Sequence, residues 1–262
     1  MSEDVMVLKK MVSGAFLVLA SSAVLAGPPK DCPVSYEQLK AALDAAQAAN
    51  NGGLGFDMWG TVVNKDGRVC AVAKTGDSLN DQWLASRVIS AQKAYTAATL
   101  SNNKGSSHST GGAFGFSTAS LYGTVLEGGP LYGLQHSNPV DAQTAYAGNS
   151  SKFGAQNDPL VGRRIGGINV FGGGLLLVDA DDQVVGAVGV SGDTSCADHN
   201  IARRVRNNFA VNHIAQGPTS EWDIDYAGTV NGAGPYPDCA GNGGSKAFYE
   251  GTIVGLTQRF QP

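Results

Sequence analysis

The sequence predicts an α/β (α+β) protein in which helices flank an antiparallel sheet. Two hairpin patterns support this prediction. In the first, the apolar runs 59–63 and 69–73 are separated by residues 64–67, Asn-Lys-Asp-Gly, which favour a tight turn. In the second, the runs 175–178 and 184–190 enclose residues 179–183, whose short acidic and amide side chains bond to local backbone in turns. Segments with helical patterns lie before, between and after these hairpins, as expected for a sheet covered by helices.

Four segments have the composition or spacing of a helix: residues 35–49, 81–100, 117–126 and 195–209. We expect Asp81 to open the second helix, and Ser117 or Thr118 to cap the third. Ser195 precedes Asp198 with the spacing of a capping box, which opens the fourth helix. Three of these helices are expected to turn an apolar face inward. The residues are Leu39, Ala42, Leu43 and Ala46 in 35–49; Leu84, Val88, Ala91, Tyr95 and Ala98 in 81–100; and Ala197, Ile201, Val205 and Phe209 in 195–209. A last helix or strand is expected at 245–259.

Length and composition indicate one domain with a sizeable core and an extension. The chain has 262 residues, of which 42% are hydrophobic and 15% are charged. We expect the domain at 27–217 and a C-terminal extension packed on it at 218–262. The net charge is -4 and no stripe of Lys and Arg is present, which argues against nucleic-acid binding.

The N-terminal segment has the pattern of a signal peptide at residues 1–26. Lys9 and Lys10 precede an apolar run at 11–25, and small residues lead to an expected cleavage after Ala26. The alternative is an uncleaved membrane anchor, but the run is shorter than the ~20 residues that a span needs. The sequence therefore predicts a periplasmic or secreted protein without stable membrane insertion after cleavage.

Four cysteines, all beyond the expected cleavage point, suggest two disulfides in an exported protein. Four cysteines allow three pairings, and spacing alone does not choose among them. We favour Cys196 with Cys239 and Cys32 with Cys70. A zinc site is the alternative, which the absence of a Cys-x-x-Cys spacing disfavours.

Three stretches occur in an order that resembles a known family. They are residues 171–202, with GGGLLLVDADDQVVGAVGVSG followed by D-x-x-IA; residues 62–77 with the helical 92–100; and residues 117–135, STASLYGTVLEGGPLYGLQ. Together they resemble the GlcG/HbpS-like haem-binding family, also called haem-degrading domains. The resemblance implies the fold, binding of haem or a related tetrapyrrole, slow degradation of haem with release of iron, and a homo-oligomer.

Haem requires an apolar slot, donors for two propionates and often an axial ligand. Small residues at 172–174, 186 and 189, with the helix that carries Tyr95, are candidates for the slot; bulges and close helix–sheet packing are the alternative. For the iron, His136 is the leading histidine and His199 the second. The resemblance adds Thr118, from the Thr-x-x-Leu motif, and the phenols of Tyr122 and Tyr132 are further candidates.

Two kinds of group are candidates for the propionates. The cationic side chains are Arg87, Lys93, Arg163 and Arg164. The loop at 191–194 is expected to present N–H groups at the start of a helix, which suits an anion. The candidate residues in this loop are Ser191, Gly192 and Thr194. Ordinary ion pairs and simple helix capping are the alternatives.

The long segment 127–167 is rich in Gly, Pro, Asn and Gln around an expected aromatic cluster of Tyr132, Tyr146 and Phe153. We interpret it as a lid or an oligomer contact. The leading hypothesis is an exported haem-binding protein. The alternatives are a periplasmic small-ligand sensor or carrier, a ligand-free assembly protein, and an enzyme for a small organic substrate, although no Gly-x-Ser-x-Gly elbow or catalytic pair is present.

Overall fold

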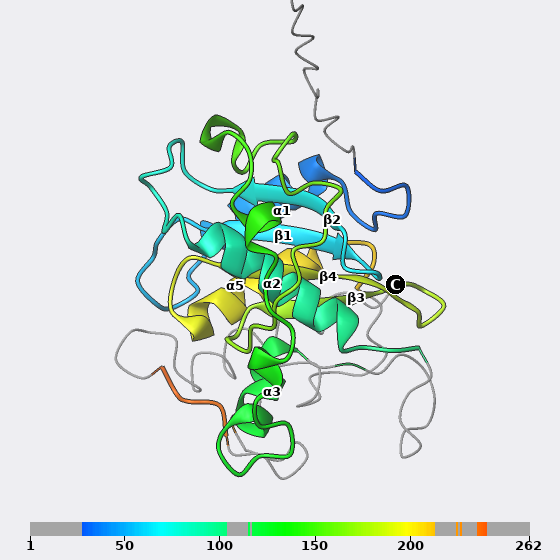
Figure 1. The fold of residues 1–262 in the computed structure, drawn as a ribbon. Coiled ribbons are helices and arrows are strands. Elements are labelled where there is room, and N and C mark those ends of the chain that lie inside the picture. Colours follow the sequence, from blue (N-terminus) through cyan, green and yellow to red (C-terminus); the bar gives the residue numbers. More distant parts are fainter. Residues whose placement is uncertain are drawn as a thin grey trace, which may run out of the picture.

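The computed structural model describes residues 28–103, 115, 117–212, 224, 226 and 235–239. Its centre is a four-stranded antiparallel sheet in the order β2-β1-β4-β3 (Figure 1). The strands are β1 (Trp59–Asn64), β2 (Val69–Lys74), β3 (Gly174–Val178) and β4 (Val184–Ser191). Both expected hairpins are confirmed, and they join through β1 and β4, which pair from Trp59 with Ser191 to Asn64 with Gly186.

Local chemistry explains both hairpin turns. In the first, the Gly67 N–H donates to the Asn64 carbonyl at 3.0 Å, and its φ of 79° lies in the region that glycine adopts readily. In the second, Asp182 has a φ of 57°, a conformation that Asp tolerates better than most residues. The turn residues therefore fix the register of each pair of strands.

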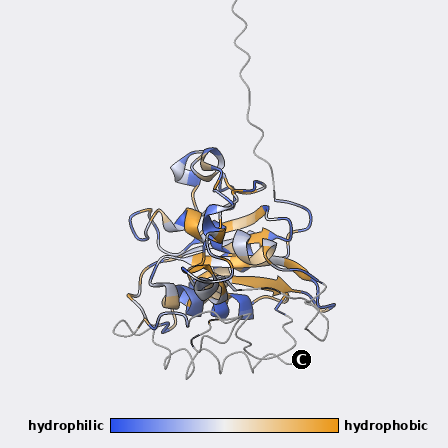
Figure 2. Cartoon of the chain, turned by 60° about the horizontal axis from the view of Figure 1, so that its bottom comes forward, coloured by the Kyte–Doolittle hydropathy of each residue, from blue (hydrophilic) through white to orange (hydrophobic). Residues whose placement is uncertain are grey.

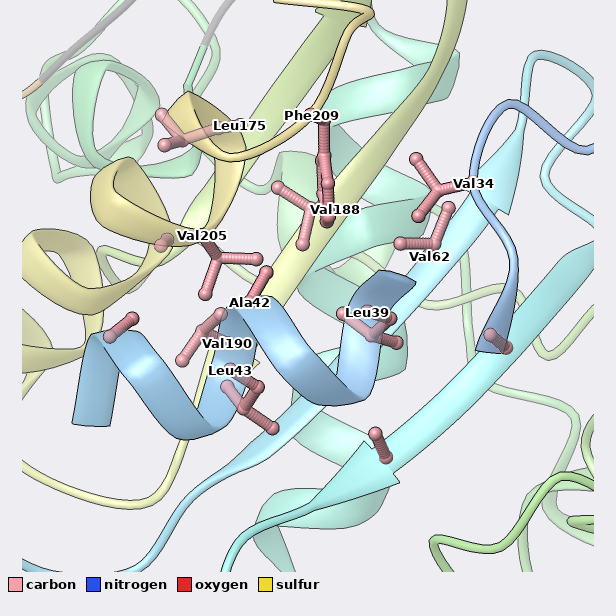
Figure 3. Packing of buried hydrophobic residues seen from close by; sticks show 14 of the residues in the cluster. Val34, Leu39, Ala42, Leu43, Val62, Leu175, Val188, Val190, Val205 and Phe209 are labelled. Atoms are coloured by element: carbon pink, nitrogen blue, oxygen red, sulfur yellow. The ribbon is translucent and has the colours of Figure 1, made fainter. Parts of the chain in front are cut away.

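One face of the sheet is covered by α1 (Tyr36–Gln47) and α5 (Ser195–Asn207), which also contact each other. Figure 3 shows Leu39 and Leu43 of α1 near Val188 and Val190 of β4 and Val205 of α5. All of these side chains are buried, and in Figure 2 the hydrophobic colour follows the strands in the middle of the molecule. This cluster is the larger part of the hydrophobic core.

The other face is covered by α2 (Ser86–Thr99) and by part of the long segment that follows α3 (Thr118–Val125). Three short helices lie in that segment: η1 (Leu134–His136), α4 (Ala142–Ala145) and η2 (Ser150–Lys152). The core on this face includes Ala145, Leu160, Val161 and Ile165 from the same segment. Residues 145–165 therefore complete the core, contrary to the expectation of a lid.

The expected aromatic cluster in this segment is wrong. Tyr132 and Tyr146 are 69% and 70% exposed, whereas the ring of Phe153 lies 3.7 Å from the guanidinium of Arg87. Periodicity did not reveal this because each aromatic residue belongs to a different short element.

Two helix starts differ from the prediction. Helix α2 begins at Ser86, because Asp81 accepts hydrogen bonds from Asp77 and Ser78 in the preceding loop. Leu84, expected on its inward face, is 48% exposed. Helix α5 is capped by Thr194, whose hydroxyl accepts from the Ala197 N–H, and not by Ser195.

The favoured disulfide pairing is confirmed: Cys32 bonds to Cys70, and Cys196 bonds to Cys239. All four cysteines are therefore used, which removes the zinc alternative. Among the described residues, no helix has the length and apolar character to cross a membrane. The expected signal peptide and the expected element at 245–259 lie outside the described residues.

Candidate functional site

The small residues expected to form a slot are filled by the chain itself. A Cβ at Gly189 would lie 2.0 Å from the Ser90 carbonyl oxygen in α2, and one at Gly174 would lie 2.4 Å from Cγ2 of Thr118. Tyr95 packs instead on the first hairpin turn, 2.6 Å from where a Gly67 Cβ would be. The glycines thus allow helices to approach the sheet closely, and no flat ligand fits between them.

A buried ion pair lies beneath residues 172–174. Lys93 of α2 donates to Asp198 of α5 at 2.6 Å and to the Val190 carbonyl at 3.0 Å. Both side chains are buried, so desolvation lowers the pKa of Lys93 and raises the pKa of Asp198 to about 6. Lys93 therefore joins three elements of the fold, and its position is inconsistent with binding a propionate at the surface.

His199 is next to this pair and is fully buried. Its Nδ1 accepts the Gly173 N–H at 3.3 Å, which leaves the ring hydrogen on Nε2 when the imidazole is neutral. Burial, with the nearby charges of Arg203, Arg206 and Lys93, holds the pKa of His199 well below its usual value. A protonated Nε2 donates a hydrogen bond and does not coordinate iron, so this arrangement does not fit an axial ligand.

Thr118 also has a structural role. Its hydroxyl donates to the Phe171 carbonyl and accepts the Gly174 N–H at 2.9 Å, and the side chain is buried. Because both functions of the hydroxyl are used, Thr118 attaches the first turn of α3 to the start of β3. The geometry does not place it as an iron ligand.

Arg87 is another predicted cation that lies in the interior. Its guanidinium forms a bidentate pair with Asp158 and donates to the Ala145 carbonyl. Both side chains are almost fully buried. Arg164 pairs with Asp66 at the surface. Arg163 is exposed. Hydrogen bonds from Thr144 are the main cause of the lowered pKa of Asp141 at the N-cap of α4, and the charge of Arg163 adds a smaller contribution.

The loop at 191–194 binds the chain's own carboxylates. The Asp193 N–H donates to Asp198 at 2.9 Å, and Asp193 accepts from the backbone of Thr194, Leu54 and Phe56. Ser191 belongs to β4 and pairs with Trp59. Gly192 is buried against Met58. The amides of Asp193 and Thr194 are thus occupied by internal anions, so the expected anion site is not open there.

The polypeptide after α3 carries a different group of residues. We call residues 126–136 the arm. Three of its apolar or aromatic side chains are exposed, Leu126 by 42%, Leu131 by 39% and Tyr132 by 69%, and His136 is exposed as well. The arm leaves α3, which lies on the side of the edge strand β3 (Figure 1). It therefore presents an imidazole, a phenol and apolar surface to solvent.

The backbone of the arm is ordered by its own hydrogen bonds. The Leu131 N–H donates to the Thr124 carbonyl at 2.9 Å, and the His136 N–H donates to Gly133 at 3.0 Å in η1. Beneath the arm, Leu121 and Val125 of α3 pack with Ile168 and Val170, and Leu134 of η1 packs against this cluster. The arm thus combines exposed side chains with a fixed base.

A shallow cavity of about 500 Å³ lies between the end of α1, the loop 49–56 and α5. Amide side chains and apolar groups both line it, among them Asn50, Leu54, Phe56 and Ile201. Asp193 is at its base but is already bonded to backbone N–H groups. Among the described residues that line this cavity there is no histidine or tyrosine.

Sequence reasoning missed two residues that bond to predicted site residues. Asp158 lies in a segment without periodicity, so only its buried contact with Arg87 shows its role. Tyr236 follows a Gly-rich stretch, and its hydroxyl accepts the Gly172 N–H at 2.9 Å. Its spacing of three residues from Cys239 was the one available signal that it lies near α5.

Comparisons with known proteins place this geometry in a wider context. A family model described as "Haem degrading protein HbpS-like" matches residues 34–206. No curated protein matches the chain. Among solved structures, Klebsiella pneumoniae protein ORFY is similar at 25% identity, with 66% of this chain and 86% of that chain covered and a TM-score of 0.43.

Two further structures are similar at lower identity. One is described as a PduOC–haem complex, at 20% identity, with 67% of this chain and 91% of that chain covered and a TM-score of 0.43. The other is a double mutant of Streptomyces reticuli HbpS, at 17% identity, with 74% and 96% covered and a TM-score of 0.39. The family match, which covers more than half of the chain, is the stronger finding.

Proposed function

The chain belongs to the HbpS-like family of haem-degrading proteins, and from this premise we propose that it binds haem, or a related tetrapyrrole, on the arm. The observation that supports this location is the exposure of His136 and Tyr132 beside Leu126 and Leu131. Imidazole and phenolate are both established ligands of haem iron, and apolar side chains suit the macrocycle.

The residues present fit haem at the arm and not in the interior. His136 would supply the ring nitrogen for the iron, with the Tyr132 phenol as the alternative. Leu126 and Leu131 would contact the ring. The exposed Arg163 bonds through its backbone to Val69 of β2, so we assign it no propionate of haem bound on the arm. When bound, haem would supply a redox-active iron.

Export and turnover complete the proposal. The N-terminal pattern and the two disulfides favour an oxidising compartment, which supports a periplasmic or secreted protein. The proposal includes slow degradation of haem with release of iron, because an exposed site leaves the macrocycle open to dioxygen and an external reductant. It also includes a homo-oligomer, supported by the exposed Phe56, Trp83 and Leu84.

The test is a titration of the folded protein with ferric haem, followed by absorbance. We expect a saturable Soret band, and we expect His136→Ala to shift that band and to weaken binding by about ten-fold or more, a loss of roughly 1.4 kcal/mol. Ser137→Ala, at the neighbouring exposed position, is the matched control and should leave the spectrum unchanged. Weak, nonsaturating uptake by the unaltered protein would contradict haem binding. Identical spectra for His136→Ala, Tyr132→Phe and the unaltered protein would contradict the arm as the site.

A small-ligand sensor or carrier is the second candidate function, and the cavity at loop 49–56 favours it. Its volume of about 500 Å³ lies within the usual range for small-molecule sites. Its mixture of amide and apolar groups suits a neutral polar molecule. A rise in melting temperature with small neutral ligands, in a protein that does not take up haem, would favour this alternative.

A further inference from the structure

Part of the C-terminal extension is fastened to the base of α3. Tyr236 is 4% exposed, and its ring contacts Tyr122 of α3 edge-on with the centroids 5.2 Å apart. Tyr226 also contacts the Tyr236 ring edge-on, and Ile224 joins Ala119 in the same buried cluster. We call residues 224, 226 and 235–239 the strap.

The strap also contacts residues 171–172, which bond to the first turn of α3. The Tyr236 hydroxyl accepts the Gly172 N–H at 2.9 Å, and the neighbouring Phe171 carbonyl accepts the Thr118 hydroxyl. Helix α3 is therefore held at its first turn by Thr118 and on the side of the strap by Tyr122. Its Leu121 and Val125 pack on the cluster beneath the arm. Because the arm continues directly from α3, these contacts also determine how firmly the arm is placed.

A covalent bond fastens the strap to the rest of the fold. Cys239 forms a disulfide with Cys196, which is fully buried in the first turn of α5. Cys239 is only partly buried and follows the exposed Pro237 and Asp238, so a reductant can approach its sulfur more easily than that of the fully buried Cys196.

We propose that the strap is a redox-cleavable clasp: the Cys196–Cys239 disulfide holds Tyr236 against α3, and its reduction releases α3 and the arm. The regulatory part of this inference rests on the proposed binding of haem by the arm. In the oxidised protein the arm is preorganised, and ordering it costs little on binding. In the reduced protein, haem binding must order the arm again, and this free-energy cost lowers the affinity for haem.

The reductant is a dithiol. One of its thiolates attacks the sulfur of Cys239, the S–S bond breaks, and Cys196 leaves as a thiolate that takes up a proton. The second thiol of the reductant then displaces Cys239. The dithiol ends as a cyclic disulfide, and the protein gains two electrons and two protons as two cysteine thiols.

The other disulfide provides the internal control. Cys70 lies in β2 within the main core, and Cys32 packs against that core just before Val34 and α1. The segment that Cys32 belongs to is therefore held by α1 as well as by its disulfide. Loss of the Cys32–Cys70 bond is expected to lower stability without releasing α3.

The test is hydrogen–deuterium exchange of the haem-free protein, before and after reduction with dithiothreitol and capping of the thiols with iodoacetamide. We expect exchange in peptides from 117–136 to rise by about ten-fold, the effect of roughly 1.4 kcal/mol of lost protection, while peptides from 184–191 change little. Cys196→Ala/Cys239→Ala should reproduce the rise, and Cys32→Ala/Cys70→Ala should not. Tyr236→Phe, which keeps the ring and the disulfide but loses the acceptor for Gly172, should give a smaller rise.

Haem titration of the same variants completes the experiment. We expect Cys196→Ala/Cys239→Ala to bind ferric haem about ten-fold more weakly than the Cys32→Ala/Cys70→Ala control. Unchanged exchange in 117–136 after reduction, or a rise of the same size in both double variants, would overturn the clasp. If the oxidised protein takes up no haem while exchange in 117–136 still rises on reduction, the proposed function fails and the release of α3 is supported.

Discussion

The interior beneath residues 172–174 and the arm at 126–136 both contain residues typical of ligand sites, but they use them differently. In the interior, Lys93 and His199 are buried and bonded to Asp198 and Gly173. On the arm, Tyr132 and His136 are exposed. The comparison shows that the shifted pKa values of Lys93 and His199 result from burial and do not by themselves indicate a ligand site. Access to a ligand is a separate property, which here belongs to the arm.

The largest loss of stability should follow from breaking the buried pair of Arg87 and Asp158, because the guanidinium stays charged. Asp158→Ala leaves Arg87 buried without its carboxylate, and a guanidinium does not deprotonate to relieve the cost. We expect a loss of about 3–5 kcal/mol in the free energy of unfolding, measured by urea denaturation. A loss below about 1 kcal/mol would show that the interior tolerates an unpaired charge and would weaken the contrast with the arm.

The next prediction compares the loss of stability when a glycine of each region is replaced by alanine. Gly189→Ala places a Cβ 2.0 Å from the Ser90 carbonyl oxygen, so α2 must move from the sheet, and we expect a loss of about 1–3 kcal/mol. Gly128→Ala, in the arm, meets nothing within 4 Å but keeps a φ of 81°, which costs roughly 1 kcal/mol. Thermal unfolding of both variants measures the difference, and equal losses would contradict close packing at Gly189.

The pH dependence of stability should report on His199. The pKa of His199 is well below 6.5 in the folded protein, so the ring stays neutral there while it protonates in the unfolded chain below pH 6.5. Its contribution to stability is therefore present above pH 6.5 and is lost as the pH falls, by up to about 1.4 kcal/mol per pH unit.

Comparison with His199→Asn, in which the amide oxygen can still accept the Gly173 N–H, isolates this contribution. Asp198 acts in the opposite direction, because its raised pKa of about 6 makes its contribution complete below pH 3.8 and lost as the pH rises through 6. Denaturation curves between pH 5 and 7.5 should show a smaller loss on acidification for the variant. Parallel pH profiles for the two proteins would contradict a neutral, buried His199.

The smallest effect on stability is expected on the arm. His136→Ala removes an exposed side chain, so the free energy of unfolding should change by less than about 0.5 kcal/mol. The same variant should show the altered Soret band described above, whereas His199→Asn should keep the band of the unaltered protein. Denaturation and absorbance on the same samples separate the two regions, and a large stability loss in His136→Ala would contradict the contrast.

Much of the fold could be predicted from the sequence because its signals are local. The turn at 64–67 is found as predicted. The predicted inward side chains Ala197, Ile201 and Val205 of α5 are buried, and so is Phe209, although the helix ends at Asn207. The start of α2 could not be predicted in the same way, because Asp81 has the chemistry of a helix cap but uses it in the preceding loop. Favouring Cys196 with Cys239 was correct, although spacing alone allowed three pairings.

The candidate site was harder to predict because burial is not a local property. Arg87, Lys93 and Thr118 have the side chains expected of a haem site, and only the three-dimensional structure shows that their polar atoms are used inside the protein. The glycines at 174 and 189 were compatible with either a slot or close packing, and the positions of α2 and α3 decide for packing. His136 was the leading histidine by its motif, and its exposure keeps it the leading candidate.

The attachment of α3 at its base has a consequence for divergence and engineering. Thr118 and Tyr236 hold the helix at its base, while no residue of 126–136 belongs to the two clusters that cover the sheet. Substitutions along this stretch can therefore accumulate without disturbing strand pairing. A chimaera that exchanges only this stretch between homologues should fold on the same scaffold, and under the proposed function it should carry the donor's selectivity for its tetrapyrrole.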